Sequence, residues 1–139
     1  MTVLGSQTAD LRRLGPVVDV LVFRGDIPPE RALEQDLPCV RVPAIIDTGA
    51  EVSAMRTGIA GALGLKPIGT VTVATPTLSR FVCPCYRVRV LFPGAVSIRI
   101  VITEAPMQGQ EIQCLIGRDV LQRGSFVYLG HMNTFSLSL

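Results

Sequence analysis

Tryptophan is absent from this sequence, and the aromatic residues together account for only 5% of it. Its core must therefore be built mainly from Val, Ile and Leu. Charged residues make up only 17% and hydrophobic residues 48%, a balance that argues against disorder. The net charge is only +2, the basic residues are scattered, and no cluster of Lys and Arg is interleaved with aromatic residues, so no nucleic-acid partner is expected. A length of 139 residues fits one domain.

Sequence features of secretion, membrane insertion and metal binding are also missing. Residues 1–15 contain no apolar stretch of the kind found in a secretory signal, and no apolar run approaches the roughly 20 residues that span a bilayer. We therefore expect a cytoplasmic protein with no membrane partner. Cys83 and Cys85 form a C-x-C rather than a C-x-x-C, and His131 is the only histidine. Neither a metal nor another cofactor is expected, and the two cysteines are interpreted as packing residues.

Short aliphatic runs separated by Gly and Pro predict a mainly β domain with one or two short helices. We expect a flexible N-terminal arm over residues 1–15 and one domain over residues 16–139. The expected β segments are 16–23, 39–46, 69–75, 81–92, 95–103, the apolar run 112–116, 125–129 and 133–139, and the expected short helices are 57–63 and 118–123.

One stretch carries a chemical signal. The apolar residues Ala44–Ile46 lead directly into Asp47, Thr48, Gly49 and Ala50. An apolar strand that delivers an acid to a tight turn gives that carboxylate a protected setting, and the glycine permits close backbone approach. Asp, Thr and Gly also dominate ordinary β-turns, so these three residues alone leave a simple turn as an open alternative.

The residues around this turn distinguish it from a simple turn. Ile45 to Ala50 resembles the signature of retropepsin-like aspartic proteases, two apolar residues followed by Asp-Thr/Ser-Gly-Ala. A second family element, two apolar residues and Gly before a short helix, is matched by Leu115, Ile116 and Gly117, followed by 118–121. The resemblance covers residues 16–139 and is greatest to single-domain cellular and bacterial members. It implies a closed, barrel-like β fold.

The resemblance also implies an aspartic endopeptidase that is active as a homodimer. Aspartic proteolysis uses two carboxylates around one water molecule, yet this chain has a single Asp-Thr-Gly and is too short for two such lobes. Asp47 would then meet Asp47 of a second copy across a two-fold axis. The expected substrates are extended, apolar segments of peptides or proteins.

The family implies roles for the neighbouring residues. Thr48 would hydrogen-bond across the dimer, and the Gly49 carbonyl would contact the substrate backbone. A flap would lie within 69–92 and fold over an extended peptide, which would bind by strand addition. Its tip would be formed by Thr75, Pro76, Thr77, Leu78, Ser79 and Arg80, which lack the glycines of viral flap tips.

Two further expectations leave alternatives open. Glu51 and Arg118 occupy positions that commonly hold an acid–arginine pair in the family, so a supporting salt bridge is predicted, with two solvated charges as the alternative. The segment 133–139 alternates Phe135 and Leu137 with polar residues. If a dimer sheet forms, this segment is the better candidate to join it; a core strand is the competing interpretation, and the two are not exclusive.

Two other functions compete with proteolysis. The first is a catalytically silent module of the same fold that binds peptides or mediates assembly, and the second is an unrelated barrel for a small ligand. The intact Asp47-Thr48-Gly49 favours the enzyme over the silent module, since a binding module has no need of that acid. The unrelated barrel would leave both family elements unexplained.

Overall fold

The structure, a computed structural model, describes residues 3–7, 10–34, 36–74, 80–107 and 111–139. Within these ranges the chain forms mainly strands. They are β1 (Val3–Gln7), β2 (Val17–Arg24), β3 (Val40–Ile46), β4 (Ala54–Arg56), β5 (Gly69–Val73), β6 (Phe81–Phe92), β7 (Val96–Ala105), β8 (Cys114–Ile116), β9 (Ser125–Leu129) and β10 (Thr134–Ser138). The helices are α1 (Leu11–Leu14), α2 (Ile59–Ala62) and α3 (Arg118–Leu121), with 3₁₀ turns η1 (Arg31–Leu33) and η2 (Gly130–Met132).

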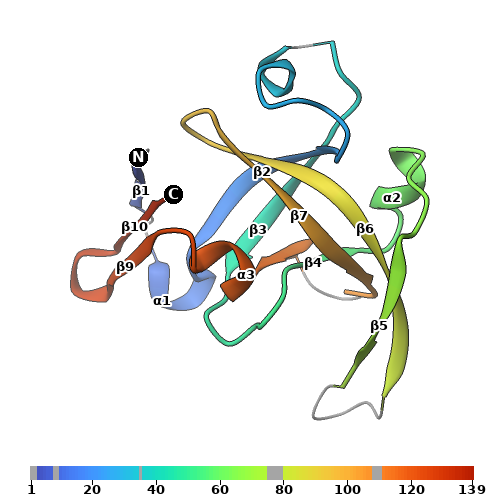
Figure 1. Cartoon of the computed structure of the whole chain (residues 1–139). Coiled ribbons are helices and arrows are strands. Elements are labelled where there is room, and N and C mark those ends of the chain that lie inside the picture. The colour runs from blue at the N-terminus through green and yellow to red at the C-terminus, as the bar shows by residue number, and fades with distance from the viewer. Residues whose placement is uncertain (1–2, 8–9, 35, 75–79, 108–110) are drawn as a thin grey trace.

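Six strands close into a barrel, to which β5 is added at one side (Figure 1). The order is β2-β3-β8-β4-β7-β6, and β6 pairs again with β2 to complete the circle. The length of β6 makes this possible, because its first residues pair with β5 and its later ones with β2. Closure leaves no exposed edge among the six strands. The β5–β6 hairpin extends away from the barrel body (Figure 1).

The barrel interior is aliphatic, as the composition predicts. Along β7, Ile98, Ile100 and Ile102 point into the core while Arg99 and Val101 are exposed, which confirms the alternation seen in the sequence. Each buried aliphatic side chain contributes about 1.5–3 kcal/mol through the hydrophobic effect. Core members with no exposed surface include Val20, Val22, Val42, Ala44, Met55, Ile59, Val88, Val90, Ile102, Cys114, Ile116 and Val120.

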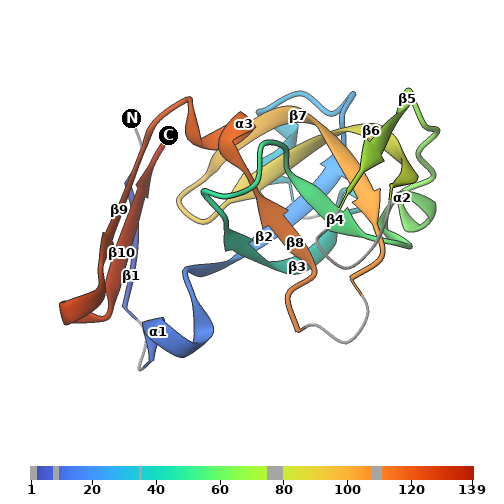
Figure 2. The same cartoon turned by 90° about the horizontal axis from the view of Figure 1, so that it is seen from below.

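A second, three-stranded sheet lies beside the barrel and contains β1 and β10, the first and last strands (Figures 1 and 2). Its order is β1-β10-β9, so β10 is the central strand. Phe135 and Leu137 of β10 are buried, in agreement with the core-strand interpretation. Within one chain β10 is paired on both edges, with β1 and β9, and the dimer sheet stays a prediction.

The segment expected to be an N-terminal arm contains two elements within its described residues. Residues 3–7 form β1, paired antiparallel with β10, and residues 11–14 form α1. The backbone N–H of Leu11, which is buried, donates to Asn133 Oδ1 at 3.2 Å. These are contacts with the far end of the chain, and no local pattern in residues 1–15 encodes them. The chain therefore uses its first residues to extend the sheet.

The predicted fold class is confirmed: the protein is mainly β, with a closed barrel and a few short helices. The segments expected at 16–23, 39–46, 81–92 and 125–129 match strands within one or two residues. The longest helices in the described ranges have four residues, and none could cross a membrane.

The four cysteines should differ sharply in reactivity. Cys39 is exposed, whereas Cys83, Cys85 and Cys114 are buried. Burial raises the pKa of Cys83, and burial with the nearby charge of Asp119 raises the pKa of Cys114 to about 12. Since the thiolate is the reactive form, a thiol reagent such as DTNB should modify one cysteine in the folded chain and four after denaturation. Fast modification of a second thiol in the folded chain would contradict this burial.

The Cys114 thiol also predicts how stability responds to alkaline pH. The folded chain holds this proton more tightly than the unfolded chain, so the free energy of unfolding should fall as pH rises from the ordinary value of 9.0 toward 12. Denaturant midpoints of the wild type and Cys114→Ala over this range test the effect. The wild type should lose the larger share of its stability.

Candidate active site

Asp47 lies at the end of β3, in a turn held by short backbone hydrogen bonds. Its N–H donates to the Ile116 carbonyl of β8 at 2.9 Å, and its own carbonyl accepts from the Ala50 N–H at 3.2 Å. The carboxylate oxygen Oδ1 accepts from the Gly49 N–H at 2.9 Å. The turn therefore fixes the position of both the backbone and the carboxylate. The side chain is only half-buried, so it can still reach a substrate.

The parallel pairing of β3 with β8 positions this turn. Ile45 pairs with Leu115 and Ile46 with Ile116, so the two family elements predicted from the sequence lie side by side. The chain then continues from Ile116 into Gly117 and α3, directly beneath the turn. Two segments about 70 residues apart in sequence thus form one unit.

Gly117 is where the two segments approach most closely. A Cβ at this position would lie 2.8 Å from the carbonyl carbon of Val52 and 2.9 Å from the carbonyl oxygen of Ala50. These are backbone atoms, which cannot rotate away as a side chain can. The N–H of Arg118, the next residue, donates to the Ala50 carbonyl at 2.8 Å. Glycine at this position allows α3 to pack against the Asp47 turn.

The predicted salt bridge between Glu51 and Arg118 does not form within the described residues. Arg118 Nη1 instead donates to the Thr48 carbonyl at 2.8 Å, and Glu51 contributes its backbone carbonyl, which accepts from the Asp119 N–H at 3.2 Å. The sequence-based hypothesis placed the arginine at the correct turn but gave it the wrong acceptor. Both side chains are exposed, and a backbone carbonyl is already fixed in place, so only the arginine side chain loses entropy in this contact.

Sequence reasoning missed two positioning residues, Ser53 and Asp119. Ser53 is fully buried, and its hydroxyl donates to Asp119 Oδ1 at 2.7 Å while accepting from the Gly117 N–H at 3.0 Å. Asp119 Oδ2 accepts from the Ser53 N–H at 3.0 Å. The pair joins the end of the Asp47 turn to the first turn of α3. The sequence offered only two weak signals for this pair: Ser53 lies a few residues beyond the motif, and Asp119 lies at the start of a helix. Both residue types are common at such positions in many folds.

A cavity of about 400 Å³ adjoins the Asp47 turn. Ala50 and Val52 line it from the turn, Leu115 from β8, and Val73 and Phe81 from the β5–β6 hairpin. Its lining is mostly apolar, a character that suits apolar side chains of a bound peptide. The remaining lining residues are Glu51, Ala54, Ala74, Thr103, Ala105, Pro106 and Met107.

The hairpin that lines this cavity is the segment predicted to hold a flap. β5 and the start of β6 pair from Gly69 with Cys85 to Val73 with Phe81, which confirms the predicted hairpin stem. The tip residues Thr75, Pro76, Thr77, Leu78 and Ser79 lie outside the described residues, and Arg80 is exposed beside them.

Within the described ranges no group of three His, Cys, Asp or Glu could hold a metal ion.

No protein-family model matches this sequence, and no curated protein matches it. Solved structures do. A retropepsin-like aspartic protease from Rickettsia conorii matches 98% of this chain and 91% of its own, with a TM-score of 0.56 and 16% identity. The foamy viral protease–reverse transcriptase, solved with an RNA/DNA hybrid, matches 78% of this chain and 12% of its own, with a TM-score of 0.51 and 14% identity. The retroviral protease-like domain of Ddi1 from Leishmania major matches 88% of this chain and 89% of its own, with a TM-score of 0.48 and 18% identity.

The chain has the fold of the retropepsin-like aspartic proteases. At these identities the likeness establishes the fold, and the assignment of an activity rests on the residues themselves. In that fold this sequence places Asp47, Thr48 and Gly49 at the turn between β3 and β4, with Gly117 and α3 beneath it.

Proposed function

We propose that this protein is an aspartic endopeptidase that hydrolyses peptide bonds in extended, apolar segments and is active as a homodimer. The observation that carries the proposal is the Asp47 turn: a half-buried carboxylate, fixed by the Gly49 N–H at 2.9 Å, beside an apolar cavity. A binding module would gain nothing from an acid held in this way. A simple β-turn would not need the support of Ser53, Gly117 and Arg118.

The chemistry requires a second carboxylate. One Asp47 removes a proton from the attacking water as the general base, and the protonated Asp47 of the other copy polarises the scissile carbonyl. Two carboxyl groups about 3 Å apart cannot both be ionised, so the pair shares one proton and titrates as a unit. The single Asp-Thr-Gly of this chain makes the second copy necessary.

Several exposed groups support dimerisation around this turn. The Thr48 side chain is exposed and makes no hydrogen bond within the described residues, so its hydroxyl is available to a second copy. The turn lies on the side of the barrel nearer the three-stranded sheet (Figure 2). On that sheet, Val127, Tyr128 and Leu129 of the edge strand β9 are exposed. An apolar edge strand with free backbone groups is suited to pairing with another chain.

Substrate would bind beneath the β5–β6 hairpin. The five residues of β5 are mostly exposed, and β5 is the edge strand of its sheet, so an extended peptide can add to it through backbone hydrogen bonds. Apolar side chains of the peptide would then enter the cavity lined by Val73, Phe81 and Leu115. This arrangement selects extended, apolar segments over folded ones.

The experiment that tests the proposal measures cleavage of a peptide library as a function of protein concentration. Activity per chain should rise with concentration and level off once the dimer dominates, because half a site performs no catalysis. Pepstatin, which mimics the tetrahedral intermediate, should inhibit the activity. Activity per chain that stays constant on dilution would contradict the shared site. Absence of cleavage with tight binding of the same peptides would favour the silent peptide-binding module.

A further inference from the structure

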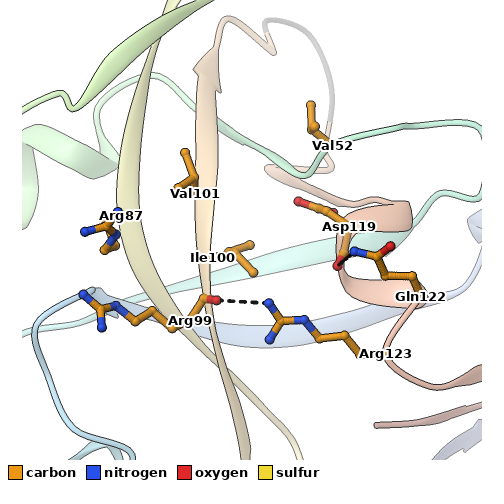
Figure 3. Close-up of a pocket in the computed structure, with 8 residues that line it drawn as sticks. All are labelled: Val52, Arg87, Arg99, Ile100, Val101, Asp119, Gln122 and Arg123. Carbon is orange, nitrogen blue, oxygen red and sulfur yellow. Dashed lines mark hydrogen bonds between the residues drawn. The ribbon is translucent and has the colours of Figure 1, made fainter.

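Basic residues gather on a face of the barrel that the proposed catalysis does not use. Two hollows of about 580 Å³ and about 470 Å³ adjoin there, and Arg87 of β6 and Arg99 of β7 line both of them. Arg123 completes the first hollow, beside α3, and Arg24 and Lys66 belong to the second. Figure 3 shows the first hollow: Arg87 and Arg99 lie on one side of it, and Asp119 of α3 lies on the other with Gln122 and Arg123, which follow α3 directly. We call these five basic residues the arginine face.

The charge of this face is out of proportion to that of the chain. Its five basic side chains stand against two carboxylates, Asp26 and Asp119, an excess of three positive charges. The whole chain has a net charge of only +2, so the rest of the molecule is slightly negative. Charge on one face of a nearly neutral protein is a local feature, and it attracts a partner of opposite sign to that face.

The two carboxylates make their closest contacts elsewhere, and neither forms an ion pair with Arg87 or Arg99. Asp26 pairs with Arg24 at 3.2 Å, a contact that lowers the pKa of Asp26, and the charge of Arg99 lowers it further. Asp119 accepts from Ser53 and from the Val120 N–H. Within the described residues neither Arg87 nor Arg99 has an ion-pair partner, and both side chains are exposed. Their guanidinium groups are therefore available to a ligand.

Backbone contacts hold the surrounding basic residues in place. Arg24 Nη1 donates to the Leu63 and Gly64 carbonyls, both at 3.4 Å, and Arg123 Nη2 donates to the Arg99 carbonyl at 3.4 Å (Figure 3). A guanidinium that is already oriented loses less side-chain entropy when it binds a carboxylate. The rigid strands β6 and β7 carry the two shared arginines.

The other lining residues indicate the kind of anion. The exposed aliphatic side chains Val52, Val101 and Ile68 lie among the charges, with 44%, 44% and 52% of their surfaces accessible. None of the described lining residues is aromatic, so the face lacks the stacking platforms on which single-stranded nucleic acids bind. Alternating carboxylates and aliphatic side chains would match it.

We propose that the arginine face is a docking site for an acidic peptide segment that also carries aliphatic residues, on a protein partner. Arg87 and Arg99 bind its carboxylates, and the aliphatic residues rest on Val52, Val101 and Ile68. Val52 also lines the cavity beside the Asp47 turn, so a segment docked on this face lies next to the cleft. The site needs no catalysis, and its test is independent of the proposed protease activity.

The test is fluorescence anisotropy of a labelled peptide of roughly 12 residues, about 40 Å when extended, in which Glu alternates with Leu. Asp47→Asn serves as the background, so the peptide is not cleaved. We expect saturable binding that weakens by at least about tenfold between low and physiological salt, because the contacts are exposed charges. A peptide with Gln in place of Glu should not bind.

Matched variants locate the site. Arg87→Gln/Arg99→Gln should weaken binding by about tenfold or more, whereas Arg12→Gln/Arg13→Gln, with the same change of charge on α1, should not. Glutamine retains the Cγ of Arg87 that lies against Gly25, so the fold should persist, which circular dichroism can check. Equal weakening in both variants would overturn the proposal, and so would absence of binding. Tighter binding of a labelled single-stranded oligonucleotide, lost in the first variant, would reassign the face to nucleic acid.

Discussion

Replacing Asp47 with asparagine is expected to abolish peptide hydrolysis while leaving the fold intact. The amide cannot act as a general base, and it cannot carry the shared proton of the pair. Because general acid and base catalysis each contribute about 10²–10⁴-fold, the loss in kcat should reach at least about 10³-fold. In the wild type the Gly49 N–H donates to Asp47 Oδ1 at 2.9 Å, and the amide oxygen of asparagine can accept the same hydrogen bond. The free energy of unfolding should therefore change by less than about 1 kcal/mol.

A matched control makes the same chemical change at another aspartate. Asp19, on β2, forms an exposed ion pair with Arg41 at 3.0 Å. Such pairs contribute about 0–1 kcal/mol, so Asp19→Asn should retain full activity and nearly full stability. Hydrolysis that survives in Asp47→Asn, or that is lost equally in both variants, would remove Asp47 from the catalytic role.

Gly117→Ala should damage both stability and activity, although residue 117 need never touch a substrate. The new Cβ would lie 2.8–2.9 Å from backbone atoms of Val52 and Ala50, so either the Asp47 turn or α3 must move. Overpacking of this kind costs about 1–3 kcal/mol. A shift of the turn by about 1 Å could cost roughly 10²-fold in rate. Denaturant unfolding and peptide hydrolysis measure the two effects.

Gly61→Ala is the control for this substitution. Gly61 lies in α2, and a Cβ added there meets no atom within 4 Å. Alanine in a helix is more favourable than glycine by about 0.5–1 kcal/mol, so this variant should be slightly more stable and fully active. Equal behaviour of the two alanine variants would show that the packing of Gly117 does not position the turn.

The barrel could be predicted in large part because its strands carry local signals. The alternation of Ile98, Ile100 and Ile102 against Arg99 and Val101 indicates one buried face, and that face is the barrel interior. β4 (Ala54–Arg56) was not predicted. It has three residues, too few for a period to show, and its pairing with β7 and β8 depends on residues far away in the sequence.

The N-terminal segment is a second case in which strand pairing depends on residues far away in the sequence. Nothing in residues 1–15 alternates clearly, yet residues 3–7 pair in register with β10 from Val3 with Ser138 to Gln7 with Thr134. The partner strand lies more than 120 residues away in the sequence, so the pairing is decided by tertiary contacts. A sequence-based analysis without that partner could only expect an arm.

At the site, the motif residues were predictable and their supports were not. Asp47 and Gly49 share the hydrogen bond that holds the turn, and Gly117 lies where the packing leaves no room for a Cβ. Arg118 was assigned to Glu51 because the family that the sequence resembles commonly holds an acid–arginine pair at these positions, but the turn presents the Thr48 carbonyl to the guanidinium instead. Ser53 and Asp119 were missed because a serine and an acid have many other roles, and only the folded chain brings the two together.

The central claim, that two copies of Asp47 form one site, is tested most directly by mixing. Wild-type protein at fixed concentration is incubated with increasing amounts of Asp47→Asn chain, and peptide hydrolysis is then measured. The account predicts that activity falls as the variant is added, because each mixed dimer holds one Asp47 and lacks the second carboxyl group. Activity that stays at the wild-type level, however much variant is added under conditions of subunit exchange, would contradict a shared site.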